Sequence, residues 1–121
     1  MQAGRELDAK VAEALGFQGV KYGRDEVGEY AHMISEEGHS LGKVVNVPKF
    51  STTGDGMLQL IEAARLQGIW LDHETFADGY EVNACVYRSK LSRTVLADSM
   101  FRAEDLPGEY ARVYIKAKEA V

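Results

Sequence analysis

Residues 48–121 read PKF STTGDGMLQL IEAARLQGIW LDHETFADGY EVNACVYRSK LSRTVLADSM FRAEDLPGEY ARVYIKAKEA V, and the order of elements within them decides the fold. A Ser51-Thr52-Thr53 cap leads into an amphipathic helix over residues 57–67. Strands are predicted near residues 69–73, 80–88 and 93–98. A last helix begins at Asp105-Leu106-Pro107, where proline is tolerated in the first turn. No catalytic motif appears among these elements, so the pattern favours a binding protein over an enzyme.

The two helices of this segment have clear boundaries and buried faces. Thr52 or Thr53 caps the first one, Asp55 favours its dipole, and Gly68 ends it. Both helices carry apolar residues at helical spacing, which predicts one buried stripe on each. The stripes are Met57, Leu60, Ile61 and Ala64 on the first helix, and Leu106, Tyr110, Val113, Tyr114 and Ala117 on the second.

The N-terminal part predicts a helix and a hairpin. Leu7, Val11 and Leu15 keep helical spacing, and Gly16 stands at the end of that helix. Residues 16–28 are rich in glycine and charge, which indicates a turn with a short strand near residues 20–22. Residues 29–35 alternate in polarity, residues 36–40 form a turn, and residues 41–47 return as a second strand before Pro48.

These elements predict an α+β fold with the order α-β-β-α-β-β-β-α. The strand over residues 80–88 mixes apolar and polar residues on both faces, so we expect it to be central in its sheet. The architecture expected is an antiparallel sheet with helices packed on it. A chain of 121 residues builds one core, so we expect a single domain over residues 1–121.

Composition and charge exclude several classes of function. Hydrophobic residues at 45% and charged residues at 27% are typical of a folded globular chain. The net charge of −5 argues against a sequence-independent grip on DNA or RNA. Residues 88–121 nevertheless hold 7 Lys/Arg against 5 Asp/Glu, whereas residues 1–87 hold 7 against 14. A small anionic ligand is therefore expected at the C-terminal third or at a helix N-terminus.

Localisation and redox state follow from what the sequence lacks. No apolar stretch is long enough for a secretory signal or a membrane span, so a cytoplasmic protein without a membrane partner is expected. Cys85 is the single cysteine, so no internal disulfide forms. It lies in an apolar-rich strand, where a buried structural cysteine is the commoner case.

The side chains that carry chemistry in other proteins form no recognisable motif. His32, His39 and His73 match no metal-binding spacing, and one cysteine cannot complete a zinc site. No nucleophile elbow, Walker loop or G-x-G-x-x-G is present. We therefore expect no enzyme activity, no catalytic residues, no metal and no cofactor.

The remaining candidates suit a compact molecule that carries phosphate. Arg112 and Lys116 lie four residues apart on one helical face, and Arg88 and Arg93 flank the connection between two strands. Tyrosine rings offer surfaces on which a base stacks, and Ser51 to Gly54 stand at a helix N-terminus. The alternatives are that the helical tyrosines belong to the core, that Arg112 and Lys116 form a solvated face, and that the Ser51 to Gly54 segment only caps its helix. The tyrosines concerned are Tyr87, Tyr110 and Tyr114.

Several short motifs resemble the small bacteriophage ABA-sandwich domain proteins. They are Gly4 to Glu13 in the first helix, Val47-Pro48-Lys49-Phe50-Ser51-Thr52-Thr53, Leu96-Ala97-Asp98-Ser99, and the Asp105-Leu106-Pro107 helix with Arg112. Some proteins of this type act as anti-Thoeris sponges. These are oligomeric proteins that bind cyclic ADP-ribose isomers made by TIR-domain immune proteins and sequester them without cleavage.

The resemblance implies a non-enzymatic phage protein that removes a cyclic nucleotide signal from the cytoplasm of the infected bacterial host. It also implies a homo-oligomer, with the ligand held near a subunit interface by Tyr87 and Arg112, and with Lys116 in place of a second arginine. On this basis Arg112→Ala is expected to abolish binding. The ligand-binding residues expected are Tyr87, Arg88, Arg93, Arg112, Lys116, Ser51 and Thr52. Two alternatives are an enzyme that degrades the signal and a protein-interaction module that inhibits a host factor.

Overall fold

The computed structural model describes residues 1–35 and 42–120, which form three helices and six strands. The turn expected at residues 36–40, with His39, lies outside the described residues. The elements in chain order are α1 (Arg5–Ala14), β1 (Gln18–Arg24), β2 (Glu29–Ser35), β3 (Lys43–Asn46), α2 (Gly54–Leu66), β4 (Trp70–Phe76), β5 (Gly79–Ser89), β6 (Ser92–Asp98) and α3 (Leu106–Glu119).

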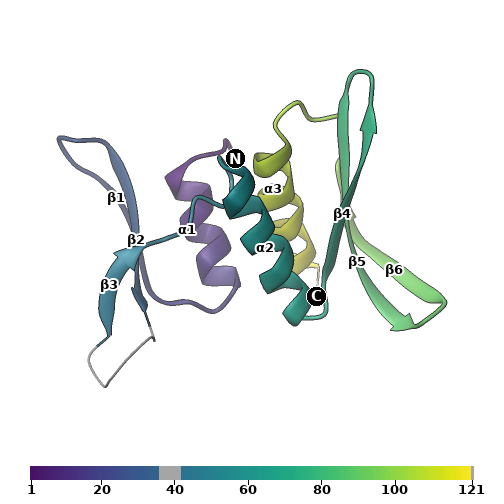
Figure 1. Ribbon diagram of the computed structural model, residues 1–121, viewed down its shortest axis with the longest axis horizontal. Helices are drawn as coiled ribbons and strands as arrows, with labels where there is room; N and C mark the ends of the chain where they lie inside the picture. Colours follow the sequence, from purple (N-terminus) through teal and green to yellow (C-terminus); the bar gives the residue numbers. More distant parts are fainter. Residues whose placement is uncertain (36–41, 121) are drawn as a thin grey trace.

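The helices form a middle layer with one antiparallel sheet on each side, as Figure 1 shows. One sheet has the order β1-β2-β3 and the other β4-β5-β6. The α+β class with antiparallel strands packed against helices is therefore confirmed. The strands divide between two sheets rather than forming one, because α2 separates β3 from β4 and carries the chain across the helical layer. Each sheet packs one face on the helices and leaves the other exposed.

The predicted helix boundaries are confirmed. The Thr53 hydroxyl accepts a hydrogen bond from the Gly56 amide at 2.9 Å, and the Asp105 carboxylate accepts one from the Gly108 amide at 3.0 Å. Gly16 and Gly68 follow α1 and α2 with φ values of 87° and 83°. Only glycine adopts this left-handed conformation without strain, so both helices end where the glycines stand.

The first sheet contains one strand more than the predicted hairpin. The short strand expected near residues 20–22 extends over Gln18–Arg24 and pairs with β2. Glycines on the neighbouring strand β1 leave room for two side chains on the outer face of β2, because a Cβ at Gly19 would meet the end of Ile34 and one at Gly23 would meet the end of Tyr30. Glycine-rich sequence here marks close packing within a sheet as well as a turn.

The second sheet has β5 at its centre, as the mixed polarity of residues 80–88 predicted. Val82 and Ala84 are fully buried on the side that faces α3. Cys85 is also buried, although it alternates with them and lies on the outer face. Its register partners on the same face are Trp70 and Val95, and Trp70 forms part of the candidate site.

The tyrosines of α3 belong to the core. Tyr110 and Tyr114 are 2% and 0% exposed. Burial raises the pKa of each phenol to about 12. The Tyr114 hydroxyl donates to the Gln67 side chain, and the Tyr110 hydroxyl lies 2.7 Å from His73 Nδ1. The interpretation of these two rings as core residues is therefore correct, and Tyr87 is the exposed one of the three candidate tyrosines.

A buried polar network ties α1 to the segment before α2. Asp8 is fully buried, and its carboxylate accepts hydrogen bonds from the Ser51 amide at 2.8 Å and the Ser51 hydroxyl at 2.7 Å. Arg5 pairs with the same carboxylate at 2.8 Å and donates to the backbone oxygens of Ala31 and Val47. The network joins α1, β2 and the chain between β3 and α2, so it fixes how the first sheet sits on the helices.

Candidate functional site

Three large side chains gather on the outer face of the second sheet, and we call Trp70, Tyr87 and Arg93 the aromatic cluster. Trp70 begins β4, Tyr87 lies near the end of β5, and Arg93 faces Tyr87 from β6. The Trp70 and Tyr87 rings meet edge to face, with centroids 5.1 Å apart and an interplanar angle of 84°. Strand register therefore brings together residues that are up to 23 positions apart in sequence.

The aromatic cluster is open to solvent. Trp70 is 38% exposed and Tyr87 45% exposed, and 46% of the Arg93 side chain is accessible. Arg93 makes a long ion pair of 3.5 Å with Asp72. The pKa of its guanidinium is raised, first by the hydrogen bond to Tyr87 and also by the charge of Asp72. Arg93 is thus a positive charge beside the Tyr87 ring, which in turn contacts Trp70.

Cys85 lies on the same face of the sheet as this cluster and is buried. Its register partners are Trp70 on β4 and Val95 on β6. Burial raises the pKa of the thiol above its ordinary value, so the thiol remains protonated at neutral pH. The expectation that Cys85 is buried is confirmed, and the exposed groups of the cluster are two aromatic rings and a guanidinium.

Arg88 belongs to the same hairpin but not to the same face. Its Nε donates to the Thr94 hydroxyl at 3.2 Å. Thr94 pairs with Val86, which packs against the core from the helix-facing side of the sheet. Arg88 and Arg93 therefore lie on opposite faces, and only Arg93 accompanies Tyr87.

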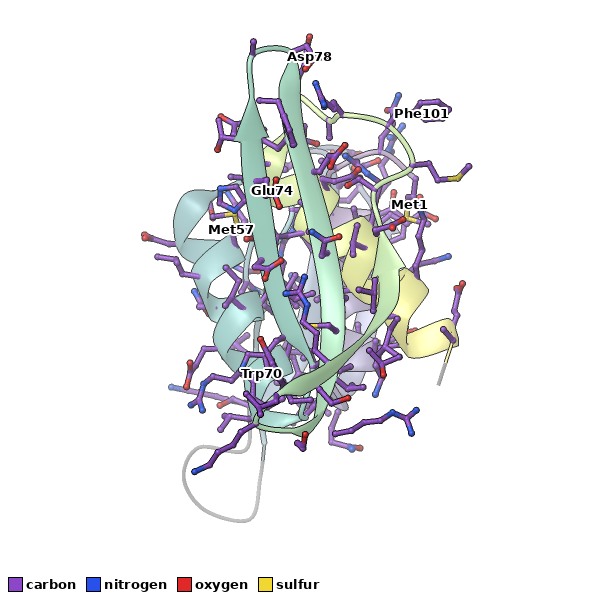
Figure 2. All side chains as sticks on the ribbon, turned by 90° about the vertical axis from the view of Figure 1, so that its right-hand side faces the viewer. Met1, Met57, Trp70, Glu74, Asp78 and Phe101 are labelled. Carbon is purple, nitrogen blue, oxygen red and sulfur yellow. The ribbon has the colours of Figure 1, made fainter. Side chains whose placement is uncertain are left out.

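Arg112 and Lys116 lie on α3 beside α1, away from the aromatic cluster. Arg112 pairs with Glu109 at 2.9 Å and with Asp105 at 3.5 Å, and it donates to the backbone oxygen of Met1 at 3.2 Å. Figure 2 shows Met1 to one side of the second sheet and Trp70 at its lower end. The expected combination of Tyr87 with Arg112 is not formed within one chain, because strands and helix direct these side chains to different surfaces.

Ser51 and Thr52 have different surroundings from those expected of ligand-binding residues. Ser51 is fully buried, and its hydroxyl is engaged by Asp8 and by Gly4. The expectation that it contacts a ligand is corrected, since no atom of its side chain reaches solvent. Thr52 is exposed, but Thr53 supplies the hydroxyl that caps α2. Capping and core packing account for this segment.

The two described histidines lie in separate places. His32 stacks on Tyr30 on the first sheet with ring centroids 4.8 Å apart, whereas His73 contacts Tyr110 and Tyr80 on the second. Among residues 1–35 and 42–120, no group of three or more His, Cys, Asp or Glu side chains is arranged to hold a metal ion.

Trp70 is the site residue that the sequence did not reveal. It is the single tryptophan of the chain and stands at the start of a strand. A lone tryptophan followed by the polar side chains of residues 72–75 signals a ring on an exposed sheet face. Its contact with Tyr87 depends on the register of β4 on β5, which no local pattern fixes.

Comparison of the chain with protein-family models, with curated proteins and with solved structures finds no match. In the part of the chain that the structure describes, no helix has the length and apolar character needed to cross a membrane.

Proposed function

We propose that this chain binds a small anionic molecule with an aromatic base, and that the aromatic cluster is its contact surface. The observation that carries this proposal is the exposed Trp70 and Tyr87 pair with Arg93 directly opposite Tyr87. A base stacks on either ring, and the guanidinium pairs with a phosphate. Rings held by strands lose little conformational freedom on binding, so the surface is preorganised.

The energy that such a surface supplies is sufficient for tight binding only when the ligand is well enclosed. Stacking contributes about 1–3 kcal/mol per base, and a hydrogen bond to a charged group contributes about 1.5–3 kcal/mol. A nanomolar constant requires about 12 kcal/mol. A second chain that covers the open face would supply the difference, which agrees with the homo-oligomer proposed from the sequence.

The biological role we propose is that of a phage anti-defence protein. It sequesters a cyclic nucleotide immune signal, such as a cyclic ADP-ribose isomer, in the cytoplasm of the infected bacterium and leaves the molecule intact. The exposed stacking surface of Trp70 and Tyr87 supports the binding of a base.

The test is calorimetric titration with a panel of cyclic nucleotides, followed by heat release of the ligand and mass spectrometry. Nanomolar binding with recovery of the unchanged mass supports sequestration. Recovery of an altered mass contradicts it and favours the alternative of an enzyme that degrades the signal.

A second candidate function is contact with a host protein. Trp, Tyr and Arg are the residues that most often dominate the binding energy of protein interfaces, and all three occur in the aromatic cluster. A tight ligand stabilises the fold that it binds and so raises the melting temperature. If the chain instead binds a host protein, no cyclic nucleotide is expected to raise its melting temperature. A host protein would instead be retained from lysate by wild type and lost in Trp70→Ala.

A further inference from the structure

A groove with a positively charged rim runs between α1 and α3. Two adjoining cavities of about 410 and 240 Å³ share Lys10, Ile115 and Glu119. Leu7 and Ala14 extend the apolar floor along α1 for about two helical turns. The two cavities are shallow and open to solvent, and together they follow the helix axes, which suits a helix better than a compact ligand.

The rim of this groove carries charges that the chain leaves unpaired. Lys10, Lys116 and Lys118 make no ion pair within residues 1–35 and 42–120, whereas the charge of Arg112 is already paired with Glu109 and Asp105. Glu13 and Glu119 are the carboxylates that line the same cavities. A positive rim on a chain of net charge −5 fits a partner segment that is apolar with acidic residues.

The outward face of α2 has these properties. Leu58 and Leu66 are 60% and 75% exposed, and Glu62 lies between them at helical spacing of four residues, where its carboxylate also pairs with Arg65 of the same helix. Asp55 adds a second carboxylate in the first turn of α2. Figure 2 shows α2, marked by Met57, on one side of the molecule and Met1, which lines one of the two cavities, on the other.

We infer that α2 of one copy docks into the α1–α3 groove of another copy. Leu58 and Leu66 enter the apolar floor, and the carboxylates of α2 face the lysines of the rim. The two surfaces differ and lie on opposite sides of the helical layer, so the contact is heterologous and generates a closed ring or an open chain rather than a symmetric dimer. The inference goes beyond ligand binding and does not depend on it.

The test measures mass in solution by light scattering without any ligand. Leu58→Lys places a positive charge on α2 against the lysine rim, and Lys116→Glu reverses one charge of the rim. Each variant is expected to abolish assemblies larger than one chain at about 100 µM, a range that detects weak association. Lys21→Glu is the matched control, because it reverses an exposed lysine on the first sheet and is expected to leave assembly unchanged.

Mixing the two variants tests the heterologous geometry. Leu58→Lys keeps an intact groove and Lys116→Glu keeps an intact α2, so the mixture has one functional junction and stops at a 1:1 dimer. Circular dichroism checks that each variant is folded, and Leu66→Lys replaces Leu58→Lys if the latter is not. A monomeric wild type, assembly that survives both single variants, or a mixture that contains only monomers overturns the inference. A monomeric wild type would also remove the preformed second chain that nanomolar nucleotide binding calls for, whereas the two variant outcomes concern only this contact and leave nucleotide binding to the calorimetric titration.

Discussion

At the scale of single residues, position in the fold separates tyrosines and arginines that look equivalent in sequence. Tyr87 is exposed beside Trp70, whereas Tyr110 and Tyr114 are core residues with hydroxyls bound to other side chains. Helical spacing predicted the two core rings from the sequence. The pairing of Tyr87 with Trp70 was not predictable, because it depends on strand register.

The first prediction concerns Tyr87. Its replacement by Ala is expected to weaken binding of the cyclic nucleotide by about 5- to 150-fold, since one stacked base is worth about 1–3 kcal/mol. Tyr22→Ala removes an exposed tyrosine from the first sheet and serves as the matched control, with unchanged affinity. Calorimetry measures both constants, and equal affinities in the two variants would remove Tyr87 from the site.

The second prediction concerns Arg112. Its guanidinium holds Glu109, Asp105 and the Met1 backbone oxygen, so Arg112→Ala is expected to lower the melting temperature and to leave nucleotide affinity unchanged. This replaces the sequence-based expectation that the variant abolishes binding. Calorimetry against wild type decides between the two. A large loss of affinity in a folded Arg112→Ala protein would mean that Arg112 of one copy reaches the cluster of another.

At the scale of elements, helix caps were predictable and the links between elements were not. Thr53, Asp105, Gly16 and Gly68 stand where local sequence placed them, because a cap depends on a few neighbouring residues. The hydrogen bond between Ser51 and Asp8 joins residues 43 positions apart, and no local sequence pattern in either segment predicts it. Its burial makes it a structural link rather than a ligand site.

The third prediction follows from this link. Asp8→Ala leaves the Arg5 guanidinium without its carboxylate and is expected to cost about 3–5 kcal/mol of unfolding free energy. Ser51→Ala is expected to cost about 1–3 kcal/mol, because the Gly4 amide and the Asp8 carboxylate each lose a partner. Urea denaturation measures both values. The exposed Asp98→Ala is the control, and an Asp8→Ala protein no less stable than this control would refute the structural role.

At the scale of the whole molecule, the sequence predicted the fold class but not the arrangement of layers. Strand and helix patterns depend on neighbouring residues, whereas the division into two sheets depends on which strands meet after the chain crosses the helices. The consequence is two open sheet faces, one of which carries the aromatic cluster. Both sheets share the helical layer, and α3 supplies its core with Tyr110 and Tyr114.

The fourth prediction is a loss of stability at alkaline pH. The pKa of Tyr110 and of Tyr114 is raised from 10 to about 12, so the neutral phenols stabilise the fold fully below pH 10. This stabilisation, about 2–3 kcal/mol per tyrosine, is lost as pH rises from about 10 to about 12. Urea denaturation at stepped pH measures it. In Tyr114→Phe the free energy of unfolding is expected to fall less steeply with rising pH than in wild type. The same slope in both proteins would contradict the assignment of a raised pKa to Tyr114.

The most direct test of ligand binding at the aromatic cluster is a fluorescence titration, because Trp70 is the only tryptophan of the chain and belongs to the cluster. A cyclic nucleotide that stacks there is predicted to change the emission of Trp70 saturably, with a dissociation constant in the nanomolar range. An emission spectrum that stays constant while calorimetry shows the ligand bound, or a panel in which no cyclic nucleotide binds, would contradict the account.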